Sequence, residues 1–228
     1  VVLNEIGELI RPGVSTGELD EWAEARVRSL GAEPGFKGYR GYPATLCTSI
    51  NEQVVHGIPS HSVLLKDGDI IGIDMGTRYK GFYGDGAYTF AVGTVSEDLL
   101  QLMETCRNAL DNGVAAAILG NRVSDISAAI DRTVRSNGYE IVRDLTGHGI
   151  GASLHEDPQV INYIDGRKAE KLKTGMTLSI EPMITNGTYR VKTLADGWTV
   201  ITEDGSYSAH FEHTVAITDN GPEILTRI

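Results

Sequence analysis

Four acidic residues of this sequence lie within or at the end of apolar segments, where an unpaired charge is unfavourable. Asp74 follows Ile-Gly-Ile and Glu181 follows Leu-Ser-Ile, while Asp85 lies in Tyr-Gly-Asp-Gly and Glu212 follows a phenylalanine. A buried carboxylate needs a partner that offsets its lost hydration, and several carboxylates brought together repel one another unless a cation neutralises them. This set of acids therefore predicts a divalent metal site. Taken singly, Asp74 could instead cap a turn or pair with a basic residue, and Asp85 is typical of a turn.

His148, in Thr-Gly-His-Gly-Ile-Gly, could add an imidazole nitrogen to these oxygens, because the flanking glycines allow the backbone a tight path. A single loop histidine is otherwise more often a surface residue. One nitrogen with four carboxylates suits Mn(II), Fe(II) or Co(II), and Zn(II) is workable. Other metal motifs do not fit. The segment His155-Glu156-Asp157-Pro158 is not His-Glu-x-x-His, and Cys47 and Cys106 are too few for a structural zinc site.

The acids form two pairs because the two halves of the chain repeat each other at an offset of 107 residues. The apolar segment that ends at Asp74 matches the one that ends at Glu181. With a further insertion of twenty residues, the segment around Asp85 resembles the one around Glu212. Each half is therefore predicted to contribute two acidic strands, and we expect the four acids to meet at a pseudo-twofold axis.

Helices are predicted at corresponding places in the two halves. Polar residues that could cap a helix, Ser15-Thr16 and Ser124-Asp125, precede apolar residues spaced by four, and Gly31 and Gly138 would end these helices. A third helix is expected from Ser96 to about Leu119, because its first turn is acidic and its apolar residues recur every three or four positions. This helix would join the halves.

The whole chain, residues 1–228, is predicted to form one catalytic domain with repeat halves of about 1–95 and 96–228. Its expected class is α/β (α+β), with an antiparallel-rich sheet covered by helices.

The formal net charge of −11 argues against nucleic-acid binding. No apolar run is long enough to cross a bilayer, and the start does not resemble a signal peptide. With two cysteines, a reducing cytoplasmic setting is favoured. The chain lacks an initiator Met, so we expect further residues upstream.

Six stretches in the same order resemble the type I methionine aminopeptidases, and together they cover nearly the whole chain. They are Asn51 to Pro59, Ile73 to Asp85, Gly147 to Gly151, His155 to Pro158, Ile180 to Met183, and Phe211 to Thr214. The eleven-residue spacing between Asp74 and Asp85 is the family's own. The resemblance implies the pita-bread fold, which agrees with the internal repeat. It also implies a metal-dependent hydrolase that removes the initiator methionine from nascent proteins and peptides.

The resemblance further implies two divalent metal ions held by five residues. Asp74 would hold one ion, His148 and Glu181 the other, and Asp85 and Glu212 would bridge the pair. Two neighbouring ions can share a water molecule, lower its pKa and polarise the scissile carbonyl. The sequence does not choose among Mn, Fe(II), Co and Zn, since the affinities are similar and availability in the cell decides.

Other residues would act on the substrate. Glu181 is expected to shuttle the proton, and His56 and His155 to bind the peptide carbonyl or the leaving amide; hydrogen-bonded structural histidines are the alternative. By resemblance, the methionine side chain would lie against an apolar set, with Phe36 nearby. This set is Tyr39, Tyr42, Cys47, Leu154 and Trp198, for which ordinary core positions are the alternative. Cys47 near His56 is not expected to be a nucleophile, because no third orienting group accompanies it.

Two alternative functions stay open. An Xaa-Pro aminopeptidase or prolidase would share the metal ligands but usually carries a large extra amino-terminal domain. A catalytically silent binding protein of the same fold would have lost ligands, whereas all five are present here. The expected partners are the N-terminal Met of nascent peptides and the ribosome exit region, with no nucleic-acid substrate and no membrane. A bacterial or organellar form is expected, because no Cys/His zinc-finger extension is present. The protein is also expected to be a monomer.

Overall fold

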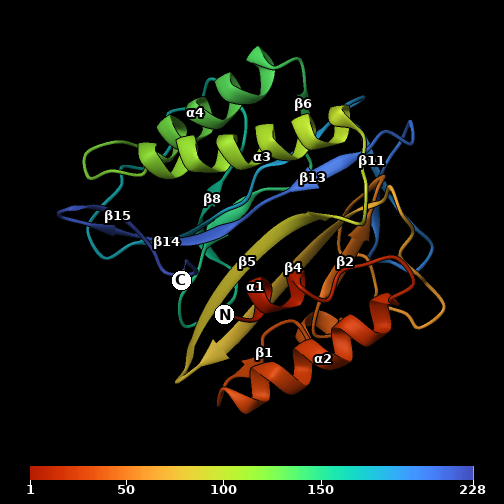
Figure 1. The fold of residues 1–228 in the computed structure, drawn as a ribbon. Coiled ribbons are helices and arrows are strands. Elements are labelled where there is room, and N and C mark those ends of the chain that lie inside the picture. Colours follow the sequence, from red (N-terminus) through yellow and green to blue (C-terminus); the bar gives the residue numbers. More distant parts are fainter. Residues whose placement is uncertain (228) are drawn as a thin grey trace.

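Each half of the chain builds a small antiparallel sheet with helices packed against it. The computed structural model describes residues 1–227. The first half contains α1 (Val2–Gly7), α2 (Thr16–Ser29), β1 (Glu33–Pro34), the 3-10 helix η1 (Tyr39–Gly41), β2 (Cys47–Ile50), β3 (Gln53–Val55), β4 (Ile70–Tyr79) and β5 (Phe82–Ala91). The second half contains α3 (Glu97–Ala116), α4 (Val123–Ser136), β6 (Glu140–Ile141), β7 (Gly147–Gly149), β8 (Glu156–Val160), β9 (Thr177–Ile180), β10 (Met183–Thr185), β11 (Val191–Thr193), β12 (Val200–Thr202), β13 (Ser208–His210), β14 (His213–Thr218) and β15 (Gly221–Ile224). The pair α1 and α2 lies on one side of the strands and the pair α3 and α4 on the other (Figure 1).

A central strand in each half has antiparallel partners on both edges. β4 pairs with β5 over its whole length, from Ile70 opposite Ala91 to Tyr79 opposite Phe82, and with β2 on its other edge. β9 lies in the same way between β14 and β7. The predicted antiparallel-rich sheet covered by helices is therefore confirmed.

The internal repeat is visible in the positions of the elements. α4 lies 107 residues after α2 at both of its ends, and β6 has the same offset from β1. Two isolated bridges repeat as well, since Ser15 pairs with Leu64 and Arg122 pairs with Lys171. The two helices thus begin at equivalent residues, as predicted. Of the two residues predicted to cap the second helix, Asp125 takes part in the cap and Ser124 does not.

The correction concerns the start of α4. Ser15 caps α2, and its side chain accepts a hydrogen bond from the Glu18 backbone N–H. In α4 the equivalent position is Arg122. The backbone N–H of Arg122 donates a hydrogen bond of 2.7 Å to the carboxylate of Asp125. Ser124 lies inside the first turn. An acid three residues into a helix can therefore close the terminus without a polar residue at the cap position itself. The predicted connecting helix is observed as α3.

Apolar contacts fix each helix pair to its own sheet. Ile71 and Ile73 of β4 are fully buried in a cluster with α1 and α2, and Ile180 of β9 is fully buried in a cluster with α3 and α4. Burying such a side chain contributes roughly 1.5–3 kcal/mol. Because successive strand residues point to opposite faces, Asp74 and Ser179 are directed away from the helices, towards the centre of the molecule.

The two halves meet along a local twofold axis between β5 and the segment that joins β13 to β14. The backbone N–H of Glu212 donates to the carbonyl of Ala87 at 2.8 Å. On one side of this bond the Thr214 hydroxyl accepts from the Asp85 N–H and donates to the Asp85 carbonyl, both at 2.8 Å. On the other side Thr89 makes the same two bonds with the backbone of His210, at 2.9 and 2.8 Å. The hydrogen bonds themselves obey the pseudo-symmetry.

This register corrects one detail of the predicted repeat. Ile73 lies opposite Tyr88, and the equivalent residue Ile180 lies opposite His213. The counterpart of Glu212 is therefore Ala87, not Asp85, and the sequence match of the two acids was displaced by two positions. The two acids nonetheless share a face of the combined sheet, since strand residues two apart point the same way.

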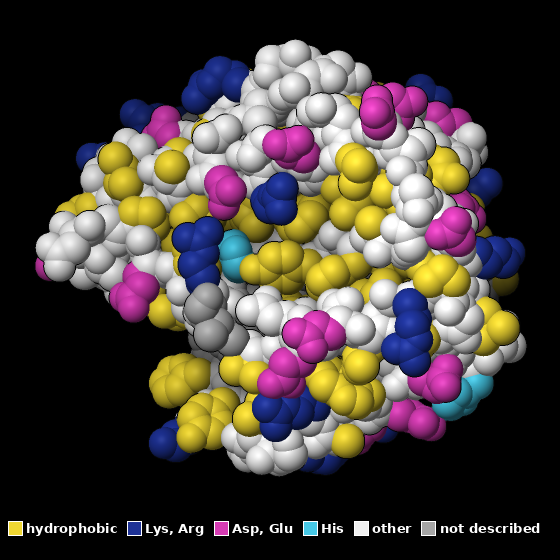
Figure 2. All heavy atoms as spheres, in the orientation of Figure 1, with side chains coloured by type: hydrophobic (Ala, Val, Ile, Leu, Met, Phe, Trp, Pro, Cys, Tyr) yellow, Lys and Arg dark blue, Asp and Glu magenta, His cyan; other side chains and the backbone are white. Residues whose placement is uncertain are grey.

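On the face shown in Figure 2, Lys and Arg side chains are interspersed with acidic ones and form no continuous basic area. None of the helices in residues 1–227 combines the length and the apolar content that a bilayer span needs.

We expect Thr214→Val to destabilise the metal-free protein by about 1–3 kcal/mol, because it leaves the Asp85 backbone N–H and C=O without partners at an unchanged side-chain volume. Thr214→Ser retains the hydroxyl and should stay near the wild-type free energy of unfolding. Urea denaturation measures both. Equal stability of the two variants would contradict the role assigned to this hydroxyl.

Candidate metal centre

The first half places two acids on neighbouring strands. Asp74 of β4 lies opposite Ala87 of β5, and Asp85 lies two residues before Ala87 in β5, on the same face. Both side chains are buried, and Asp74 Oδ1 has no hydrogen-bond partner among the described residues. A buried carboxylate oxygen without a donor is suited to a cation.

The second half adds two glutamates at the ends of strands. Glu181 directly follows β9 and Glu212 directly precedes β14, so the pairing of Ile180 with His213 brings the two glutamates side by side. Glu212 Oε1 accepts a hydrogen bond from the Ser179 hydroxyl. Ser179 thus orients one oxygen of this carboxylate and leaves the other free.

His148 enters the same space from β7. Its Nδ1 lies 2.8 Å from the carbonyl of Gly149, so this nitrogen carries the proton and Nε2 keeps a free lone pair. Nε2 lies 3.5 Å from Glu181 Oε1. A Cβ on Gly147 would clash with the Ser179 carbonyl, and one on Gly149 with the Asp157 carbonyl. The glycines on both sides of the histidine are required because β7 is packed tightly between β8 and β9.

The donor atoms are close enough to share an ion. Ligand atoms of Asp85, His148 and Glu212 all lie within 4.8 Å of one another. Asp74 and Glu181 line the same cavity. A set of carboxylate oxygens with one imidazole nitrogen and an unsatisfied buried oxygen fits a divalent ion such as Mn(II), Fe(II), Co(II) or Zn(II).

Burial dominates the electrostatics of the four acids. It raises the pKa of Asp74, Glu181 and Glu212 well above the usual carboxyl range, and the nearby acids raise each of them further. The pKa of Asp85 rises to about 7, also by burial. Without a cation, the protein can keep this cluster only by retaining protons on it.

The site opens into a cavity of about 170 Å³. All thirteen residues singled out from the sequence line it: Phe36, Tyr39, Tyr42, Cys47, His56, Asp74, Asp85, His148, Leu154, His155, Glu181, Trp198 and Glu212. The acids lie at one end. The other wall is apolar, with the Tyr42 and Trp198 rings packed edge to face at 5.0 Å between centroids.

Two more histidines border the cavity. His155 is exposed, and its ring centre lies 4.2 Å from that of His148, while its Nδ1 is 2.9 Å from the Tyr39 hydroxyl. Although His155 as a whole is exposed, its ring is partly desolvated at the cavity wall, and this desolvation and the neighbouring His148 lower its pKa to about 4. Burial lowers the pKa of His56. Both imidazoles are therefore neutral near pH 7 and each has an N–H to donate.

Cys47 belongs to the apolar wall. Burial, reinforced by Asp74, raises the pKa of its thiol well above the usual value. A thiol held in its protonated form is a poor nucleophile. This agrees with the expectation from sequence that Cys47 lines the pocket.

Two residues near the site were not found from the sequence. Arg40 is the one Lys or Arg side chain among the described lining residues of the cavity, and it lies 5.4 Å from the centre of the Tyr39 ring. His210 is buried, with Nε2 at 3.8 Å from Glu181 Oε2. Arg40 lies between two tyrosines that the sequence did single out, and His210 could have been found only from the strand register.

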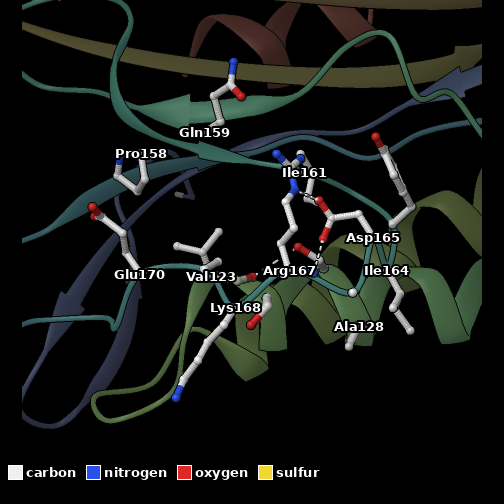
Figure 3. Close-up of a pocket in the computed structure, with 15 residues that line it drawn as sticks. Val123, Ala128, Pro158, Gln159, Ile161, Ile164, Asp165, Arg167, Lys168 and Glu170 are labelled. Carbon is white, nitrogen blue, oxygen red and sulfur yellow. Dashed lines mark hydrogen bonds and ion pairs between the residues drawn. The ribbon is translucent and has the colours of Figure 1, made fainter.

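A larger cavity, of about 420 Å³, lies elsewhere on the surface, between the start of α4 and residues 158–170 (Figure 3). There Asp165 and Arg167 pair with each other and neutralise their charges. Within residues 1–227, the cluster of acid and imidazole atoms close enough for one ion lies in the smaller cavity. Size therefore does not identify the site here, and the chemistry of the lining does.

Comparison with known proteins agrees with this geometry. Residues 1–219 match the model of metallopeptidase family M24. The methionine aminopeptidase of Clostridium acetobutylicum is 51% identical over 98% of this chain and 90% of its own length. The chain belongs to the methionine aminopeptidases of family M24. It is accordingly a metal-dependent hydrolase, and the expected pita-bread fold is confirmed.

This chain is more similar in structure and sequence to one methionine aminopeptidase than to one Xaa-Pro dipeptidase. The crystal structure of the methionine aminopeptidase from Thermotoga maritima has a TM-score of 0.98 and 43% identity, and covers 100% of this chain and 91% of its own. The Xaa-Pro dipeptidase from Bacillus anthracis has a TM-score of 0.77 and 26% identity, and this chain spans 57% of it. The likeness to the second protein lies in the shared fold.

The raised carboxyl pKa values predict how the stability of the metal-free protein depends on pH. A carboxyl whose pKa is raised on folding stabilises the folded state below its unfolded pKa, and this contribution is lost as the pH rises through the folded pKa. Above the ordinary histidine pKa of about 6.5, the buried histidines no longer contribute to the pH dependence, and only the raised carboxyl pKa values remain. We therefore expect the melting temperature of the metal-free protein to fall between about pH 6.5 and about pH 8. Asp85→Asn should flatten this fall, and added Mn(II) should restore more stability at the higher pH. A melting temperature that rises over this range would contradict the electrostatics.

Proposed function

We propose that this chain removes the N-terminal methionine from peptides and nascent proteins by metal-dependent hydrolysis. The observation that carries the proposal is the lining of one cavity. Acids and the His148 imidazole line one part of it, and apolar side chains line the other. A peptide start has the complementary character. Its ammonium group is attracted by the carboxylates, and a methionine side chain is an unbranched thioether suited to an aromatic, apolar wall.

The five ligand roles inferred from the sequence belong to this proposal. Asp74 would hold one divalent ion, His148 and Glu181 the second, and Asp85 and Glu212 would bridge them. The ions, when bound, supply an acidified water and a Lewis acid for the scissile carbonyl. Two ions are supported by the number of acids, since one ion would leave part of the negative charge in this buried cluster uncompensated. Their identity among Mn, Fe(II), Co and Zn depends on availability.

The protein's own groups would carry out the proton transfer and hold the substrate. Glu181 lines the cavity beside the other acids, and its carboxylate would take a proton from water and pass it to the leaving amine. His56 and His155, both neutral, would donate N–H bonds to the substrate carbonyl or the leaving amide. The hydroxyl of Tyr39 fixes His155 from the side, and Tyr42 is held rigid by its two hydrogen bonds to the carbonyls of Leu46 and Gly57.

The expected cellular setting follows from the substrate. All five proposed ligands come from one chain, so a monomer is sufficient for activity. Initiator methionines emerge at the ribosome, which places the proposed activity in the cytoplasm of a bacterium or in an organelle, near the ribosome exit region. An activity before proline is the second candidate, because the Bacillus anthracis Xaa-Pro dipeptidase shares the fold. The higher identity to the Clostridium acetobutylicum methionine aminopeptidase, 51% against 26% for the Xaa-Pro dipeptidase, favours the first candidate.

A peptide assay distinguishes these functions. After metal stripping and readdition of Mn(II) or Co(II), we expect cleavage of Met-Ala-Ser and not of Ala-Pro-Ala. His148→Ala and Asp85→Ala should each lower kcat by at least about 100-fold, more than the loss of an outer hydrogen-bond partner. The matched control is His61→Ala, which removes an exposed imidazole that pairs with Glu21 far from the acids and should leave turnover unchanged.

Each outcome has a distinct meaning. Cleavage of Ala-Pro-Ala alone would replace the methionine assignment with the prolidase alternative. A failure to cut either peptide with any of the metals would leave the binding-protein alternative. Normal turnover in His148→Ala or Asp85→Ala would refute the ligand set.

A further inference from the structure

His210 is a buried histidine whose side chain lacks an evident structural purpose. It ends β13, is 3% exposed, and its Nε2 has no hydrogen-bond partner among the described residues. The backbone of this residue is held by the Thr89 hydroxyl, so the side chain is not needed to fix the chain at this point. An unpaired buried polar group lowers stability, and its presence in a core calls for a functional explanation.

The pseudo-symmetry gives this side chain a defined place. The two hydrogen bonds from Thr89 to the backbone of His210 repeat the two from Thr214 to the backbone of Asp85. His210 is therefore the counterpart of Asp85 across the axis. Asp85 points into the acid cluster, and the equivalent direction in the second half leads the His210 imidazole to the same cluster. Its Nε2 lies 3.8 Å from Glu181 Oε2.

Glu181 thus lies between two imidazoles, one at each oxygen. His148 Nε2 is 3.5 Å from Oε1, and His210 Nε2 is 3.8 Å from Oε2. The two histidines differ in their other contacts. His148 uses Nδ1 to donate to the Gly149 carbonyl and so keeps a lone pair on Nε2. His210 has no such partner, and its Nε2 can carry the proton.

We propose that His210 is a positioning residue for Glu181, and that its Nε2–H donates to Oε2 after a small rotation of the carboxylate. Oε1 is then directed to the side of His148, where the proposed function places a metal ion. The inference rests on that proposed function, because it assigns the partner that fixes one of the ligands. Partners of this kind hold ligating carboxylates in one orientation and commonly change metal affinity by roughly 10–100-fold.

The test compares two replacements of His210 in the full chain. His210→Leu removes the donor at a similar volume, and His210→Gln keeps an N–H at about the reach of Nε2. With metal-stripped protein and Mn(II) alone, calorimetric titration should show Mn(II) affinity roughly 10–100-fold weaker for His210→Leu and close to wild type for His210→Gln. The metal-free His210→Leu protein should melt at the wild-type temperature or above, since an apolar side chain replaces an unpaired polar one.

His213→Gln is the matched control. This histidine is equally buried three positions along the chain, but its Nδ1 contacts Thr226 Oγ1 at 2.8 Å and its Nε2 faces the Tyr88 hydroxyl, away from Glu181. Its Mn(II) affinity should not change. A loss in this control equal to that in His210→Leu would show general disturbance and overturn the proposal.

The remaining outcomes show whether the role of His210 or the proposed function itself is wrong. Wild-type Mn(II) affinity in His210→Leu, with wild-type protein that binds Mn(II) and cuts Met-Ala-Ser, overturns the role of His210 alone. Failure of the wild-type protein to bind Mn(II) or to cut the peptide overturns the proposed function and this inference with it. A lower melting temperature in metal-free His210→Leu, together with unchanged Mn(II) affinity, would identify a purely structural histidine.

Discussion

The burial of four carboxylates at the junction of two half-sheets is the constraint on which the rest of the structure depends. Burial raises the pKa of all four acids, and the neighbouring acids raise the pKa of Asp74, Glu181 and Glu212 further, so the metal-free fold must oppose an unfavourable cluster at its own centre. Two apolar cores, one under each helix pair, stabilise the individual halves against this cost. A divalent ion converts the same cluster from a destabilising feature into a crosslink between the halves.

Hydrogen bonding at the axis makes this junction specific. Thr89 and Thr214 each satisfy one backbone N–H and one carbonyl of the opposite half, so two hydroxyls hold β5 against the segment that joins β13 to β14. Elsewhere the halves are joined by the pairing of β3 with β12. The backbone of Asp85 is one of the segments held by these hydroxyls. The position of a proposed ligand is thus set by the contact that joins the halves, and a shift of one half against the other would move donor atoms of both.

Much of this arrangement could be predicted from sequence because its signals are local. Apolar runs that end in Asp74 and Glu181, the glycines around His148 and the repeat of 107 residues all identify strands and helices without any tertiary information. The register at the axis could not be obtained in this way, since the inserted segment hides the true match of Ala87 with Glu212 and only the strand pairing reveals it. His210 escaped notice for the same reason, because its partner Glu181 lies on a different strand.

The fold is pseudo-symmetric, but the two halves contribute different residues to the site. The internal repeat explains this difference. Each position at the axis occurs twice, and an acid in both copies would add further charge to a cluster that already retains protons. The counterpart of Glu212 is Ala87, and the pairing of His148 with Ser179 makes Ser49 the counterpart of His148. Ser49 there accepts a backbone hydrogen bond from Gly57. Among these positions, only the one occupied by Asp74 in the first half and Glu181 in the second carries an acid in both halves. Electrostatics therefore limits the number of equivalent positions that can carry an acid in both halves. At the other positions, the equivalent residue in the other half can be apolar, hydrogen-bonding or positioning.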